Sequence, residues 1–153
     1  MKLLLAIDFS DITPKLLQQA KSMALGLQAE VVMIHVAETN PDLVAYDFDP
    51  ASVYAVDPAE IRDSIAERFH HEHKSLQDYA DQLRDAGINC TALMIQGDTV
   101  DLLLQEAEKL GVDFIIAGTH GKGFLSQILL GSTSEDLLRK SPLPLYLVPA
   151  DPA

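Results

Sequence analysis

The residues of this chain best suited to chemistry lie together in its last third. They are three glycines and three hydroxyl side chains that follow an apolar stretch: Gly118, Gly121, Gly131, Ser132, Thr133 and Ser134. Glycines let backbone amides approach a ligand closely, and hydroxyls beside a helix start add further donors. Because a helix N-terminus also carries a partial positive charge, the combination favours a bound phosphate. We therefore expect the phosphates of a nucleotide in this loop.

These residues also have structural interpretations. The glycines can serve turn geometry alone, and one of the three hydroxyls is expected to cap the following helix, which is compatible with a phosphate contact. Lys122, the only base of the loop, could touch a terminal phosphate, but a solvated lysine is favoured. His120 has no carboxylate neighbour in sequence to orient it, so a general-base role is not expected.

Two commoner phosphate motifs are absent from the sequence. It contains no G-x-x-x-x-G-K-[ST], and its first apolar run ends in Ala6-Ile-Asp-Phe-Ser10 without the glycines of a dinucleotide fingerprint. Asp8 in this run follows buried-type residues, where an unpaired carboxylate would be costly. We expect Asp8 to face a ligand; the alternative is that it caps the next turn through the amide of Ser10 or Asp11.

The elements that must position these residues alternate along the chain. Strands are expected at residues 2–8, 29–37, 88–96, 112–117 and 144–149, and helices at about 13–27, 58–86, 99–110 and 133–140, with Thr13 as a cap and Pro14 in the first turn. This rhythm predicts one α/β domain, residues 1–150, with a tail at 151–153. Its open parallel sheet has five strands in the order 3-2-1-4-5 and helices on both faces. Ligands of such sheets bind beyond the carboxyl ends of the strands.

Composition restricts the classes of function. The 23 acidic against 11 basic residues give a formal net charge of −12, which disfavours DNA, RNA and anionic membranes as partners. No apolar run approaches the ~20 residues that span a bilayer, so membrane insertion is not expected. The single cysteine, Cys90, agrees with a cytoplasmic location, and its strand-like surroundings favour an inert buried thiol.

Three further features are expected to be structural. Residues 38–57 are rich in proline, acidic and apolar residues, which favours a packed surface loop or a lid. His35 lies within a predicted strand and is expected to be a satisfied core or edge histidine. The cluster His70-His71-Glu72-His73 lacks an H-x-x-x-H pair, so a solvated helix face is favoured over a metal site.

The spacing of the glycine loop is the most specific signal. Gly118, two residues, Gly121, nine residues, Gly131 and then Ser132 reproduce the G-2x-G-9x-G-[S/T] signature of the universal stress protein family. The resemblance covers the whole chain, because the first strand with Asp8, the second strand ending in Ile-His-Val36 and the final Pro-Leu-Tyr-Leu-Val-Pro also look like that family.

The resemblance implies ATP as the ligand, accompanied by Mg²⁺ or Mn²⁺. By position, Asp8 would accept a hydrogen bond from the ribose or help orient the metal ion, and the backbone of Val36 would bind adenine. The ribose and phosphate path would be lined by Ala117, Gly118 and Gly121, with the phosphates held by Gly131, Ser132, Thr133 and Ser134. The resemblance also implies a homodimer that pairs the last strands, about residues 143–148. Many members have glycine where this chain has Phe9.

The sequence shows no well-formed hydrolytic constellation and therefore no catalytic residue. The first hypothesis is a dimeric, ATP-binding regulatory module of the stress response, with at most slow hydrolysis. The second is a genuine ATPase or adenylyl-transfer enzyme with the same sheet. The third is an interaction dimer that prefers AMP, cyclic AMP or no nucleotide. The protein partner cannot be named from the sequence.

Overall fold

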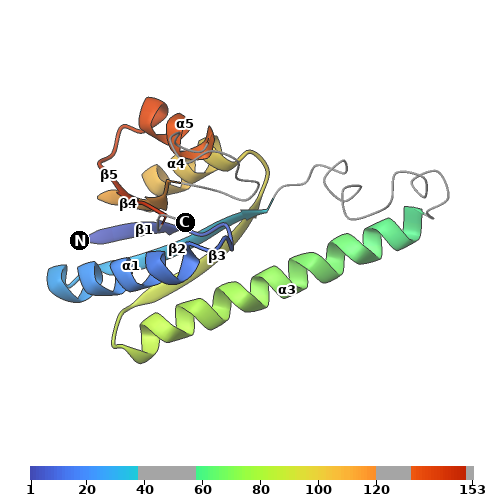
Figure 1. The fold of residues 1–153 in the computed structure, drawn as a ribbon, viewed down its shortest axis with the longest axis horizontal. Helices are drawn as coiled ribbons and strands as arrows, with labels where there is room; N and C mark the ends of the chain where they lie inside the picture. The colour runs from blue at the N-terminus through green and yellow to red at the C-terminus, as the bar shows by residue number, and fades with distance from the viewer. Residues whose placement is uncertain (38–57, 120–131, 151–153) are drawn as a thin grey trace.

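Five parallel strands form a single open sheet at the centre of the molecule. The computed structural model describes residues 1–37, 58–119 and 132–150. The strands are β1 (Lys2–Ala6), β2 (Glu30–Ala37), β3 (Cys90–Gln96), β4 (Phe114–Gly118) and β5 (Leu145–Val148). Their order across the sheet is β3-β2-β1-β4-β5, and each neighbouring pair is parallel (Figure 1). The predicted fold class and strand order are confirmed.

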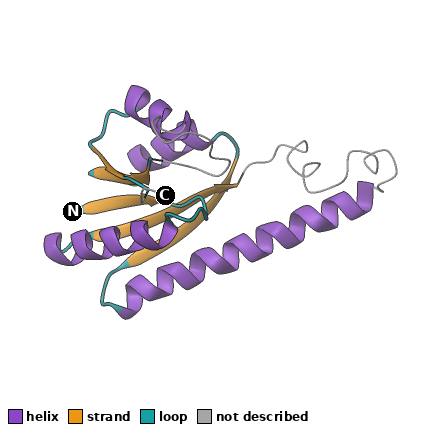
Figure 2. Ribbon diagram, viewed as in Figure 1, coloured by secondary structure: helices purple, strands orange, loops and turns teal. Residues whose placement is uncertain are grey.

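Helices cover both faces of this sheet. The described helices are α1 (Thr13–Leu27), α3 (Pro58–Asp85), α4 (Thr99–Lys109) and α5 (Ser132–Lys140). α1 and α3 lie on one face, and α4 and α5 lie on the other (Figures 1 and 2). The N-terminal part of α3 runs beyond the sheet, whereas its C-terminal part packs on the sheet through Leu76, Ala80 and Leu83. No helix of the described residues is long and apolar enough to cross a membrane.

The core has two layers because side chains of a strand alternate between faces. In β1, Leu3 and Leu5 belong to the cluster beneath α1 and α3, whereas Leu4 belongs to the cluster beneath α4. All three are 0 % exposed. In β2 every residue from 31 to 37 is buried, as expected of a parallel strand covered on both faces.

The end of the first strand and the cap of the first helix differ from the sequence-based expectation for physical reasons. β1 ends at Ala6 rather than at residue 8, because the chain turns there: Phe9 has a left-handed backbone with φ of 57°. The expectation that Thr13 caps α1 is wrong. The N-cap is Ile12, with no side-chain cap, while Thr13 is helical and buried. At the end of α3, Gly87 takes φ of 86°, the left-handed position that favours glycine after a helix.

Cys90 provides the first testable prediction. It is 5 % exposed, and burial raises the pKa of its thiol from 9.0 to about 11. The thiolate is the reactive form, so near pH 8 the reactive fraction is about 100-fold smaller than for an exposed cysteine. We expect 5,5′-dithiobis(2-nitrobenzoate) to react at least about 100-fold more slowly with the native protein than with the protein in guanidinium chloride. Equal rates would contradict the buried position of this thiol.

Candidate nucleotide-binding site

Asp8 lies directly beyond the carboxyl end of β1. One oxygen of its carboxylate, Oδ1, accepts the Ser10 backbone N–H at 3.0 Å and the Ser10 hydroxyl at 2.5 Å. The turn cap that the sequence left open as an alternative is therefore formed. These bonds use one carboxylate oxygen, and Asp8 is half-buried at the rim of the sheet. A ligand contact through the other oxygen stays a prediction.

The backbone of Val36, near the end of β2, faces the space beyond β1. The Ile34 carbonyl accepts the Ile7 N–H at 2.9 Å, toward β1, and the Ala37 carbonyl accepts the Gly97 N–H at 3.2 Å, toward β3. Because successive residues of a strand direct their backbone groups to alternate sides, the N–H and C=O of Val36 point the same way as those of Ile34. The β1–β2 ladder stops before it reaches them.

A buried hydroxyl joins the start of α5 to the end of β4. The Ser134 hydroxyl donates to the Gly118 carbonyl at 2.7 Å, and Ser134 is 3 % exposed. This bond fixes the first turn of α5 beside the carboxyl end of β4. The backbone N–H groups of a first turn have no partner within their own helix. Ala117 is buried in the cluster with Leu137 of α5, and Thr133 is exposed. Since the hydroxyl of Ser134 has one hydrogen, what remains for a phosphate here is its backbone amide.

The remaining candidates lie partly or wholly outside the described residues. These are His120, Gly121, Lys122 and Gly131, and of Ser132 only the backbone is described, as the first residue of α5. The structure thus brings Asp8, Val36, Ala117 and Gly118 to the carboxyl end of the sheet, because β1, β2 and β4 are parallel neighbours. The Ser134–Gly118 hydrogen bond adds the start of α5, which carries Thr133 and Ser134.

His35 is a buried, hydrogen-bonded histidine and the three histidines of α3 are exposed, as the sequence predicted, whereas His120 lies outside the described residues. His35 is 6 % exposed, and its Nδ1 lies 2.8 Å from the Ile7 carbonyl. His70, His71 and His73 are exposed, and the described residues contain no group of three His, Cys, Asp or Glu side chains able to hold a metal ion. Glu72 was expected on the same solvated face, and that expectation is wrong: its Oε2 lies 3.2 Å from His35 Nε2.

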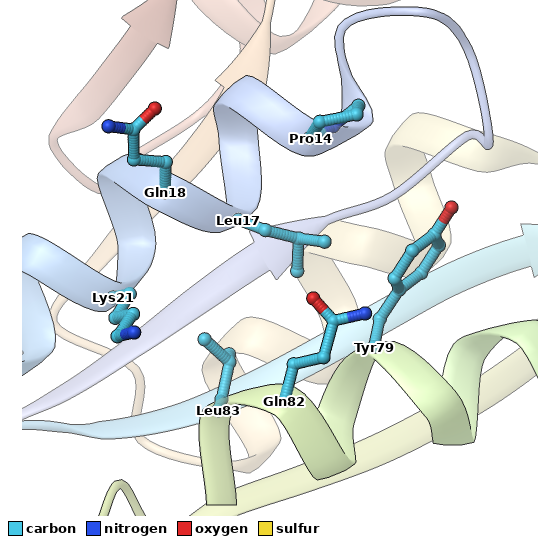
Figure 3. A pocket seen from close by; sticks show the side chains of 7 residues that line it. All are labelled: Pro14, Leu17, Gln18, Lys21, Tyr79, Gln82 and Leu83. Carbon is cyan, nitrogen blue, oxygen red and sulfur yellow. The ribbon is translucent and has the colours of Figure 1, made fainter. Parts of the chain in front are cut away.

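A groove between α1 and α3 is a separate feature from this edge of the sheet. It has a volume of about 390 Å³ and is lined by Pro14, Leu17, Gln18 and Lys21 of α1 and by Tyr79, Gln82 and Leu83 of α3 (Figure 3). All of its lining residues come from the two helices that cover one face of the sheet. Nucleotides of open parallel sheets bind at the strand ends instead, so the groove is not the candidate site.

The fold described above agrees with the comparison with known families. The sequence model of the universal stress protein family matches residues 1–149. The chain belongs to this family. A curated family member, universal stress protein MJ0577 of Methanocaldococcus jannaschii, is 28 % identical over 152 residues, covering 96 % of this chain and 93 % of that protein. A solved structure of MJ0577 superimposes with a TM-score of 0.79 at 26 % identity, covering 99 % of this chain and 97 % of that one.

Two solved structures of family members hold nucleotides. One is a universal stress protein in complex with cAMP, with a TM-score of 0.62 and 19 % identity, covering 97 % of this chain and 95 % of that one. The other is a family protein of Arabidopsis thaliana with AMP bound, with a TM-score of 0.62 and 15 % identity, covering 99 % and 92 %. At these identities the likeness to this chain is one of fold.

Proposed function

We propose that this universal stress protein binds ATP at the carboxyl edge of its sheet and acts as a nucleotide-dependent regulatory module. The observation that carries the proposal is the convergence of three kinds of group at that edge. A carboxylate stands beyond β1, backbone groups of Val36 point past the end of β1, and the first turn of α5 is fixed to the end of β4 by Ser134. Nucleotides bound to two members of the same fold support it.

Each part of ATP has a chemically suitable partner in this arrangement. Adenine carries an amino donor beside a ring-nitrogen acceptor, which matches the C=O and N–H of Val36. The ribose hydroxyls can donate to the carboxylate of Asp8. We propose that the triphosphate lies at the N-terminus of α5 and the glycine loop, because backbone amides and a helix dipole favour an anion. Lys122 is proposed as a solvated residue that can reach a terminal phosphate.

Mg²⁺ or Mn²⁺ is proposed to arrive with the nucleotide. The described residues hold no cluster of three carboxylates, histidines or cysteines, and Asp8 already accepts two hydrogen bonds from Ser10. This donor set fits an ion that is held mainly by phosphate oxygens and water, with Asp8 as an indirect partner.

The edge strand β5 is proposed as the dimer contact. It lies at one end of the strand order, so one side of its backbone is unpaired within the sheet, and Tyr146 on it is 40 % exposed. Two copies that pair their last strands would satisfy those backbone groups. We further propose that the acidic protein works in the cytoplasm without nucleic acid as a partner.

Isothermal titration calorimetry tests the proposed function. We expect saturable one-site binding of ATP with Mg²⁺, whereas AMP and cyclic AMP should bind more weakly because they lack the terminal phosphates. Phosphate release is expected at no more than about one turnover per minute, far below the ~10 per second typical of enzymes. Absence of heat with all three nucleotides would overturn the proposal. Fast release that depends on His120 would instead favour the enzyme alternative.

A further inference from the structure

The His35 ring occupies the place where the β1–β2 ladder would otherwise continue. In the register of the two strands Ala6 lies opposite Ile34, so His35 lies opposite Ile7. The Ile7 N–H donates to the Ile34 carbonyl, and the next bond of a parallel ladder would run from the Val36 N–H to the Ile7 carbonyl. That bond is not formed between these two described residues. The Ile7 carbonyl instead lies 2.8 Å from Nδ1 of His35.

Within the described part of the chain, the Val36 N–H therefore has no backbone acceptor on the side of β1. A buried backbone N–H is normally paired, and the carbonyl that the sheet geometry would give to Val36 receives the side chain of His35 instead. Because a carbonyl oxygen only accepts, Nδ1 of His35 must carry the hydrogen of this bond. The ring therefore acts as the donor that ends the ladder one step early.

The His35 ring also packs against Phe9, the residue that follows Asp8. The ring of Phe9 lies 4.5 Å from the His35 ring, centroid to centroid, and 6.1 Å from the ring of Tyr79. Phe9 has the left-handed φ of 57°, which is unfavourable for a non-glycine residue and needs compensating contacts. His35 thus holds both chain neighbours of Asp8, Ile7 through a hydrogen bond and Phe9 through ring packing.

Glu72 of α3 fixes the orientation of the ring. Its Oε2 lies 3.2 Å from His35 Nε2, its side chain is 12 % exposed, and its Oε1 lies 3.6 Å from Nε of Arg68. With Nδ1–H directed at a carbonyl, the contact between Nε2 and the carboxyl group needs one further proton, on either partner. The pair connects the long helix α3 to the turn that carries Asp8.

We propose that His35, oriented by Glu72, is the positioning residue of the nucleotide site. It holds Asp8 through Ile7 and Phe9, and by occupying the Ile7 carbonyl it keeps the Val36 N–H unpaired for an acceptor atom of an adenine ring. This inference rests on the proposed function for the identity of the ligand. The arrangement of His35, Ile7 and Val36 can be tested without any nucleotide.

The test uses two replacements that each keep one half of the ring's hydrogen bonding. In His35→Asn the side-chain amide nitrogen can take the place of Nδ1, so the Ile7 carbonyl stays occupied. In His35→Gln the amide nitrogen reaches the place of Nε2, toward Glu72, and releases the Ile7 carbonyl to the Val36 N–H. Circular dichroism and thermal unfolding establish that both variants are folded.

Amide hydrogen exchange of nucleotide-free protein gives the first result. In the native protein and in His35→Asn we expect the Val36 amide to exchange at least about tenfold faster than the Ile34 amide inside the ladder. In His35→Gln the Val36 amide should become protected at least about tenfold. Equal protection of Val36 and Ile34 in the native protein overturns the inference, even if His35→Gln does not fold.

ATP affinity, measured by calorimetry, gives the second result. We expect His35→Gln to bind ATP at least about tenfold more weakly than His35→Asn, corresponding to the loss of one hydrogen bond. Native affinity in His35→Gln overturns the positioning role while leaving the proposed function intact. The two proposals can also fail separately in the other direction. If the native protein shows the expected exchange pattern but binds no nucleotide, the proposed function is overturned, while the role of His35 at the end of the β1–β2 ladder is not.

Discussion

Replacing Asp8 by alanine is expected to weaken ATP binding by about 10- to 100-fold. A hydrogen bond to an ionised group contributes about 1.5–3 kcal/mol, which corresponds to that range of affinity. The carboxylate stands alone at the end of β1, with one oxygen on Ser10, so its removal deletes the acceptor proposed for the ribose. Titration calorimetry of native and variant protein with ATP and Mg²⁺ measures the change.

Two matched variants separate this role from the turn that Asp8 also closes. Ser10→Ala removes the hydroxyl partner but keeps the carboxylate and the backbone bond, so ATP affinity should stay within about threefold of native. Asp8→Asn keeps an oxygen for the Ser10 N–H without the charge, and its affinity should fall between the other two. If Ser10→Ala loses as much affinity as Asp8→Ala, the carboxylate serves only the turn.

Leu5→Ala is expected to lower the free energy of unfolding by about 3 kcal/mol, within the usual range of about 2–5 kcal/mol for a buried leucine. Leu5 is 0 % exposed in the central strand β1 and packs in the cluster beneath α1 and α3. Close packing there leaves a cavity that neighbouring side chains cannot fill completely. Urea denaturation, analysed at fixed protein concentration, measures the loss.

Leu25→Ala is the matched control for this prediction. Leu25 lies on α1 but is 51 % exposed, so the same change in side-chain size removes little buried contact. The free energy of unfolding should change by less than about 1 kcal/mol, helped by the high helix propensity of alanine. Equal losses in the two variants would contradict the layered core of the sheet.

The sequence predicted the sheet well because its strands are central and continuously apolar. Seven successive residues of β2 are buried, as are the leucines of β1. Such continuous apolar runs are typical of a parallel sheet that is covered on both faces. Helical spacing likewise predicted which faces of α1 and α3 are buried. The buried residues recur every three or four positions: Leu16, Ala20 and Ala24 in α1, and Leu76, Ala80 and Leu83 in α3.

A local turn and contacts between elements distant in sequence explain what the sequence did not predict. Thr13 has the residue type of a cap, but the turn from residue 8 to 12 places it inside α1 and buries it. Glu72 has the residue type of a solvated face, yet the docking of α3 directs it at His35, 37 positions away. The left-handed Phe9 likewise depends on rings supplied by β2 and α3.

The sequence predicted which strands and helix carry the candidate site residues. The structure shows how part of these residues are arranged. Asp8, Val36, Gly118 and Ser134 are brought to one edge because parallel strands end on the same side. The roles of these residues toward a ligand stay predictions, as do those of Gly121, Lys122 and Gly131, which lie outside the described residues. Neither the residue type nor the spacing of His35 predicted its contact with the Ile7 carbonyl beside Asp8.

A titration of ¹⁵N-labelled protein with ATP and Mg²⁺, followed through backbone amide shifts, locates the nucleotide on the protein. We expect saturable shifts at the amides of Asp8, Val36, Thr119 and Thr133, at the carboxyl end of the sheet. The amides of Leu17 and Leu83, in the groove between α1 and α3, should stay unchanged. Shifts that concentrate in that groove, or a spectrum that does not respond to ATP, would contradict the proposed site.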